Sequence, residues 1–217
     1  MTLDSRTATS LTANDACVVF GLKTGEIVRS LEEAGRPEAR VGELRGPESA
    51  TLTKLIGYLI DKHHVYARRQ AAAIVVLLAR LSAAHEQSRP ELARVRVLFA
   101  ALRRELLFHM EKEEVSLFPR IIRAEAAATR EEPQEATHAH PVRDPIRMLM
   151  HEHDGLCSML DEIRAATNDY SPPAAACANY RTLCRALRDL ELDLLHLIYL
   201  EDRVLFPRAL GMERGRG

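Results

Sequence analysis

The sequence predicts an all-α protein: an up-down four-helix bundle with a short helical N-terminal extension. Ala, Leu, Glu and Arg are abundant among the 217 residues, Trp is absent and aromatic residues make up only 5%, a composition that favours helices. Four long segments place apolar residues at i, i+3, i+4 and i+7, the spacing of one helix face. No segment is convincing as a strand. About 47% apolar content is ample for a core.

The chain divides into three predicted parts. Residues 1–48 hold a short amphipathic helix from Gly25 to Gly35, closed by glycine, and a polar linker rich in Pro, Gly and Arg. Residues 49–211 form the bundle, and 212–217 are expected to be a disordered tail. The four bundle helices are predicted at about 49–87, 90–127, 144–167 and 174–206, with a polar loop at 128–142 and a turn at "NDYSPP".

Composition excludes several classes of protein. The net charge is −1, so no overall field favours nucleic acid or an anionic membrane. No apolar run approaches the roughly 18 residues of a membrane span, and we expect no signal peptide. The four cysteines form no CxxC pair, which predicts free thiols in a reducing cytoplasm.

One octet pattern, acid-acid-x-x-Leu-Phe-Pro-Arg, occurs twice. "EEVSLFPR" begins at Glu113 and "EDRVLFPR" begins at Glu201, 88 positions later. A recurring helix-stop signal is one explanation. An internal duplication that brings two carboxylates to one site is the other.

The residues upstream favour the duplication. His64 precedes Glu113 by 49 residues and His153 precedes Glu201 by 48. His109 and Glu113 are about 40° apart on a helix, so both can face one point. Two such halves can enclose a pair of metal ions, because one Glu can bridge two cations while imidazoles bind their outer positions. The Phe and Pro after each Glu would then form a dry lid and a helix stop.

Each candidate also has an ordinary explanation, because a single bundle histidine is more often structural or solvated than a ligand. The joint pattern favours a metal site. Glu105 and Glu152 can orient imidazoles or simply be solvated. His63 and His151 are expected to lie behind the ligands or at the surface.

Five stretches resemble the hemerythrin-like di-iron proteins, in particular the iron–sulfur cluster repair family (Repair of Iron Centres). They are "LIDKHHVYARRQ", "LRRELLFHMEKEEVSLFPRI", "MHEHDGL", "TNDYSPPAAAC" and "YLEDRVLFPRAL". The resemblance implies a bundle holding two non-haem Fe ions, with His64, His109, Glu113 and His153 as ligands and Glu201 as the second bridging glutamate. It also implies a cytoplasmic bacterial protein of nitrosative or oxidative stress, with NO or O₂ as small ligand and iron–sulfur proteins as acceptors.

Two features depart from that family. The family has a histidine four residues before the final bridging glutamate, and here Leu197 stands there, with His196 one residue earlier. On a regular helix His196 lies about 140° from Glu201. We therefore expect a π-bulge between them, which would return His196 to the site as a ligand. The family's N-terminal cysteine pair is reduced to Cys17 alone, which puts any thiol function there in doubt.

Three functions remain open. One is a di-iron protein of the cluster-repair type, with redox chemistry on NO or O₂ if it is an enzyme. The second is a hemerythrin-like module that binds or senses O₂ or NO without turnover. The third is a metal-free scaffold, which the buried ligand set disfavours. The ligand set would also accept Mn or Zn, and the protein can be a monomer or a homodimer.

Overall fold

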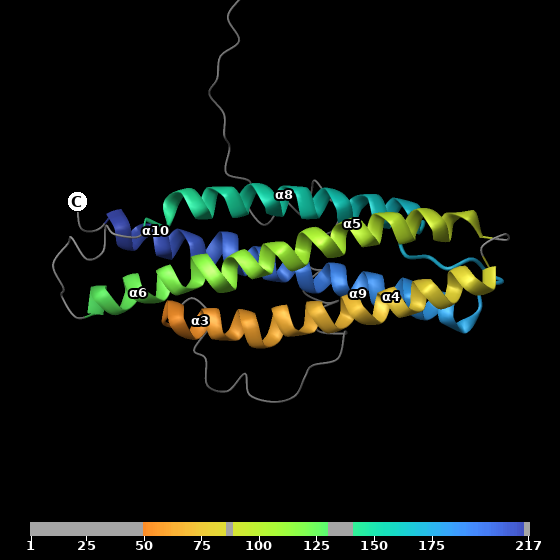
Figure 1. Ribbon diagram of the computed structural model, residues 1–217, viewed down its shortest axis with the longest axis horizontal. Helices are drawn as coiled ribbons and strands as arrows, with labels where there is room; N and C mark the ends of the chain where they lie inside the picture. Colours follow the sequence, from red (N-terminus) through yellow and green to blue (C-terminus); the bar gives the residue numbers. More distant parts are fainter. Residues whose placement is uncertain (1–49, 86–88, 130–140, 215–217) are drawn as a thin grey trace, which may run out of the picture. The chain divides into compact units, whose positions relative to one another are not determined.

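The computed structural model describes residues 50–85, 89–129 and 141–214, which form four long helical rods (Figure 1). The first rod comprises α3 (Leu52–Tyr58), the π-helical segment η1 (Leu59–His64) and α4 (Val65–His85). The second comprises α5 (Pro90–Lys112), the π-helical segment η2 (Glu113–Leu117) and α6 (Phe118–Thr129). The third is α8 (Arg143–Ala166). The fourth comprises α9 (Ala178–Leu200), the π-helical segment η3 (Glu201–Leu205) and α10 (Phe206–Arg214).

The rods pack side by side as a closed bundle. Helix α4 contacts α5 and α9, and α8 also contacts α5 and α9. The second and fourth rods also touch each other, through α6 and α10. The predicted all-α four-helix bundle is therefore confirmed. The predicted helix at 25–35, its linker and Cys17 lie outside the described residues.

Leucine is the commonest residue in the core, and the largest fully buried side chains are Phe99, Phe118 and Phe206. A side chain of the second rod stabilises the N-terminus of the first rod. Glu125 accepts hydrogen bonds from the backbone N–H of Leu52 at 2.6 Å and of Thr53 at 2.9 Å. Thr51 caps the same helix by accepting from the Lys54 N–H. A carboxylate at a helix N-terminus also interacts favourably with the helix dipole.

The last residue of each octet, an arginine, donates a hydrogen bond to a backbone carbonyl in the other half of the molecule. Arg120 donates to the Pro141 carbonyl at 3.4 Å and Arg208 donates to the Ala50 carbonyl at 2.6 Å. Each carbonyl lies two residues before the first helix of the other half. This reciprocal arrangement supports the interpretation of the octets as parts of a duplicated helix pair.

The prolines of the octets do not stop their helices, contrary to our expectation. The rods continue through Pro119 and Pro207 as α6 and α10. In each copy the π segment begins at the glutamate, and the residue before proline donates its N–H five residues back, Phe118 to Glu113 and Phe206 to Glu201. The widened turn changes the hydrogen-bond register just before proline, which lacks an N–H, so the helix can accommodate it.

The fourth rod begins at Ala178 rather than at 174 as predicted. Asn168, Asp169 and Tyr170 all have φ near +50°, between 49° and 56°, which is rare for residues other than glycine. The Thr167 hydroxyl stabilises this turn by accepting from the Tyr170 N–H. The chain then makes another turn, with the Ala176 N–H donating to Pro173, so the prolines precede the helix instead of starting it.

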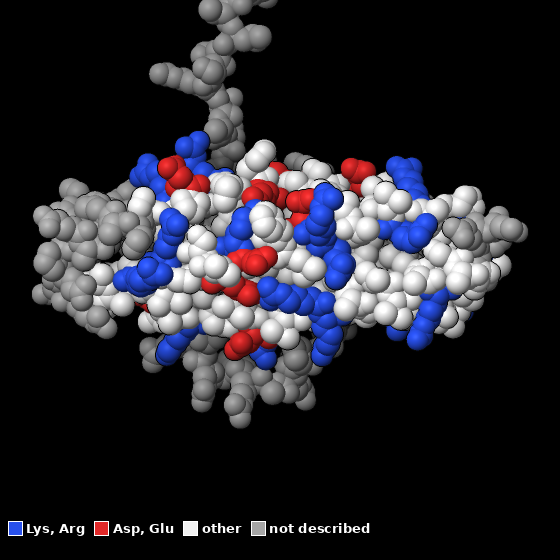
Figure 2. Space-filling view, in the orientation of Figure 1, with Lys and Arg blue, Asp and Glu red and all other residues white. Residues whose placement is uncertain are grey.

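No helix among the described residues is long and apolar enough to cross a membrane. Figure 2 shows Lys and Arg interspersed with Asp and Glu over one face of the molecule. That face carries no large patch of a single charge.

Candidate metal centre

Four buried side chains converge inside the bundle from three rods. His109 and Glu113 come from the second rod, His153 from the third and Glu201 from the fourth, and each offers one ligand atom within 4.8 Å of all the others. Both glutamates are 0% exposed. Among the described residues this is the only such group of three or more.

His64, from the first rod, completes the group on the other side of the carboxylates. Its Nε2 lies 3.5 Å from Glu113 Oε2 and 3.8 Å from Glu201 Oε1. The remaining oxygens face the other two histidines: Glu113 Oε1 is 3.5 Å from His109 Nε2, and Glu201 Oε2 is 3.3 Å from His153 Nε2. Each carboxylate therefore directs one oxygen to each side, the arrangement that a bridging carboxylate needs.

Five of the donor atoms lack a hydrogen-bond partner. Both oxygens of Glu113, both oxygens of Glu201 and His64 Nε2 are buried without a hydrogen bond. Burying an unpaired carboxylate is very costly, and divalent cations remove that cost. The residues present thus fit a dinuclear metal site.

The spacing of the imidazoles agrees with this fit. His109 Nε2 and His153 Nε2 are 2.9 Å apart. Two nitrogens bound at right angles, each about 2.1 Å from one ion, would be roughly 3.0 Å apart. His109 and His153 can therefore share one ion, while His64 would bind the other.

The two carboxylates have opposite pKa shifts. Burial, together with repulsion from Glu201, raises the pKa of Glu113. Burial alone would raise the pKa of Glu201 too, but the nearby imidazoles of His153 and His64 lower it to about 2. A bound cation would relieve the repulsion between these two carboxylates.

A carboxylate holds the outer nitrogen of each site histidine. His64 Nδ1 is 2.7 Å from Glu114 and His153 Nδ1 is 2.9 Å from Asp202. These acids directly follow Glu113 and Glu201, so the second acid of each octet orients the histidine of the same half. An Nδ1–H donated to a carboxylate leaves the Nε2 lone pair directed inward. The repeated acid-acid pair was the sequence signal for this role, which the predicted set of site residues did not include.

Glu152 does the same for His109, whose Nδ1 lies 3.0 Å away, as one of our two alternatives for it anticipated. Burial alone would lower the pKa of His153, but the hydrogen bond to Asp202 and the adjacent Glu201 carboxylate raise it to about 10. Glu105 instead pairs with its exposed neighbour Arg104. His151 is exposed.

The phenylalanines of the octets cover the histidines. Phe118 stacks on His64 with ring centroids 5.8 Å apart, and Phe206 stacks on His153 at 6.0 Å. Both rings are 1% exposed. They exclude water from one side of each imidazole, as the predicted dry lid would.

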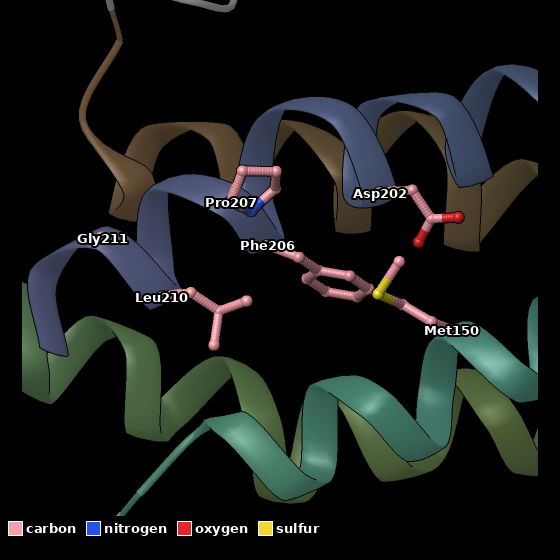
Figure 3. A pocket seen from close by; sticks show the side chains of 6 residues that line it. All are labelled: Met150, Asp202, Phe206, Pro207, Leu210 and Gly211. Atoms are coloured by element: carbon pink, nitrogen blue, oxygen red, sulfur yellow. The ribbon is translucent and has the colours of Figure 1, made fainter. Parts of the chain in front are cut away.

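A cavity of about 220 Å³ lies on the outer side of one of these rings. Its lining residues are Met150, Asp202, Phe206, Pro207, Leu210 and Gly211. Figure 3 shows the Met150 thioether and the Asp202 carboxylate beside the Phe206 ring. The cavity therefore adjoins Asp202 and Phe206, two of the residues that contact His153.

His196 does not join the group. The π segment that we expected between His196 and Glu201 begins at Glu201 instead, and the Glu201 N–H still bonds to the Leu197 carbonyl, as in an α-helix. The predicted bulge is therefore misplaced, and the helix directs His196 elsewhere. Its ring meets that of His63, with centroids 5.1 Å apart. Leu197, at the expected ligand position, is 2% exposed.

Comparison with known proteins agrees with this geometry. Residues 55–209 match the hemerythrin HHE cation binding domain. The chain is 32% identical over 162 residues to the iron-sulfur cluster repair protein YtfE of Edwardsiella ictaluri, covering 75% of this chain and 67% of that protein. It is 31% identical to the YtfE protein of Yersinia pestis strain Pestoides F, covering 73% and 66%. The protein of the same name from Musicola paradisiaca is 28% identical, covering 80% and 75%. The matched region thus spans about two thirds of the first two relatives.

Proposed function

The chain belongs to the hemerythrin HHE cation-binding family, with iron–sulfur cluster repair proteins among its relatives, and on that premise we propose that its bundle holds two non-haem iron ions bridged by Glu113 and Glu201. The observation that carries the proposal is the opposed orientation of the four carboxylate oxygens. One oxygen of each glutamate faces His64, and the other faces His109 or His153.

The donor set is unequal on the two sides. His109 and His153 would hold one ion, whereas His64 alone would hold the other, because Leu197 replaces a second imidazole. An ion on the His64 side would therefore have fewer imidazole ligands and could accept a small ligand such as NO or O₂. Iron bound by imidazole and carboxylate supplies one-electron chemistry and binds such ligands.

The function that this site supports best is iron–sulfur cluster repair under nitrosative or oxidative stress. The relatives are named for that repair. An ion with a single imidazole ligand is easier to release than one with two, which suits donation of iron to a damaged acceptor protein. A cytoplasmic location would suit both the acceptors and the free thiols of Cys157, Cys177 and Cys184.

A second candidate is a module that binds or senses O₂ or NO without turnover. The nearly complete burial of the ligand set favours it, because the site histidines are at most 2% exposed and a sealed site retains its metal. The two candidates differ in iron loss. A repair protein should give iron to an apo acceptor, whereas a sensor should show reversible ligand spectra with its iron retained.

The test is iron content per chain after anaerobic purification from iron-replete cells. We expect close to two irons in the wild-type protein and less than one in Glu113→Gln and in Glu201→Gln, since each substitution removes a bridge. Glu162→Gln, at an exposed position of α8, is the matched control and should keep two. Near-zero metal in the wild type would rule out the di-iron centre.

Repair is tested separately, by mixing iron-loaded protein with an apo iron–sulfur acceptor and sulfide. If a cluster forms on the acceptor while this protein loses its iron, the result supports iron donation. Retained iron together with a reversible NO spectrum supports the sensor.

A further inference from the structure

His63 carries the same structural features as the three site histidines, yet it lies outside their group. It is 4% exposed. Its Nδ1 lies 2.9 Å from the Asp193 carboxylate, matching the contacts that orient His64, His109 and His153. Its Nε2 is buried without a hydrogen-bond partner. In metal-binding histidines, one ring nitrogen is usually hydrogen-bonded to a carboxylate while the other is left without a partner and binds the ion.

His196 supplies a second imidazole beside it. The two ring centroids are 5.1 Å apart with the planes at 90°. Two imidazoles that each bind one tetrahedral ion at about 2.1 Å would have centroids roughly 5 Å apart. The pair His109 and His153, which we assign to one ion, has centroids 4.7 Å apart. The ring centroids of the two pairs are therefore at similar distances.

Asp193 and His196 lie three residues apart on α9, so both project toward η1, which carries His63. The second oxygen of Asp193 is also buried without a hydrogen-bond partner. It is available to accept a hydrogen bond from a water on a bound ion. His196 is only partly buried, which leaves this pair open to solvent on one side, unlike the sealed centre.

We propose that His63 and His196 form a second, exchangeable site for one divalent first-row metal ion, held by two imidazoles and completed by water. Imidazole ligands suit iron, cobalt, nickel, copper and zinc. With two protein ligands the ion binds more weakly than at the carboxylate-bridged centre, and it exchanges with solvent. Asp193 orients His63 without binding the ion itself.

The probe is Co²⁺, because its visible absorption reports coordination by nitrogen ligands. Iron-loaded protein is dialysed anaerobically against Co²⁺, and both metals are counted per chain. We expect one Co²⁺ in addition to the iron in the wild-type protein. His196→Ala should lose that Co²⁺ and retain its iron. Asp193→Asn should weaken Co²⁺ binding about 10-fold or more.

Two controls separate this site from the di-iron centre. His151→Ala, an exposed histidine on α8, should leave Co²⁺ binding unchanged. Glu201→Gln should lose iron but still bind Co²⁺, and adding His196→Ala to it should abolish that Co²⁺ binding. This result would support the second site even if the di-iron proposal failed. Absence of extra Co²⁺ in the wild type, or Co²⁺ binding that His196→Ala does not change, would overturn it. The two rings would then be in simple edge-to-face packing.

Discussion

Glu152 and His63 occupy equivalent positions in the two halves of the molecule, each one residue before a site histidine, but they have different partners. Glu152 accepts a hydrogen bond from His109. His63 instead packs against His196. The residue of the second half that corresponds to His109 is Leu197, which offers no imidazole to His63. The two halves are thus related by sequence but unequal in the imidazoles that they would offer a metal ion.

Restoring the missing half should tighten the centre. The double variant His63→Glu, Leu197→His places an imidazole and its orienting carboxylate on the His64 side. We expect the iron proposed on the His64 side to be released to a ferrous chelator about 10-fold more slowly, or slower still, because the variant gains an oriented ligand. Stopped-flow absorbance of the chelate measures the rate.

Leu197→Gln is the control for this variant, because it adds a polar group of similar size without an imidazole. It should destabilise the core and leave iron release unchanged or faster. Equal slowing in both variants would contradict the ligand explanation.

The second acid of each octet should matter for metal affinity. Glu114→Gln and Asp202→Asn remove the carboxylates that orient His64 and His153. Loss of such partners typically weakens metal binding by about 10- to 100-fold. Competition with a chelator of known affinity measures the change. Glu111→Gln, exposed on α5, should have no effect, and an equal loss there would argue against orientation.

The phenylalanine over each histidine should contribute strongly to stability. Phe206→Ala removes a ring that is 1% exposed, and such truncations cost about 3–5 kcal/mol in the free energy of unfolding. Urea denaturation of the apo protein measures this. Val115→Ala, at a position 74% exposed, should change it by no more than about 0.5 kcal/mol. A small cost at Phe206 would mean that the neighbouring cavity lets the core collapse.

Stability in acid should depend on Glu125. Burial alone would raise the pKa of this carboxyl, but hydrogen bonds from Thr53 and Leu52 lower it below 4.5. The folded state therefore favours the charged form, so its contribution is fully present above pH 4.5 and is lost as pH falls below it.

Glu125→Gln should accordingly reduce the loss of unfolding free energy between about pH 5 and pH 3. Because Glu125 is partly exposed to solvent, we expect a difference of no more than about 1 kcal/mol. Thermal unfolding across this range, with Glu162→Gln as control, measures it. Parallel pH profiles for wild type and Glu125→Gln would refute the role of the cap.

The sequence by itself determined the helical bundle and the duplication. Apolar periodicity over long segments is decisive for helices, and the repeated octets relate the two halves. The same repeats pointed to Glu113, Glu201, His64, His109 and His153, the five residues that the structure brings together.

Only the tertiary structure decided the environment of His196 and the importance of His63. Angular position along a helix can be calculated from sequence only while the helix is regular. Each π segment adds a residue to one turn and so rotates everything after it by about 100° relative to an α-helix. Periodicity does not reveal where that extra residue falls. In the fourth rod the extra residue lies after Glu201 rather than before it, so His196 faces His63. The pairing of carboxylates with imidazoles is likewise set by contacts between rods that are distant in sequence.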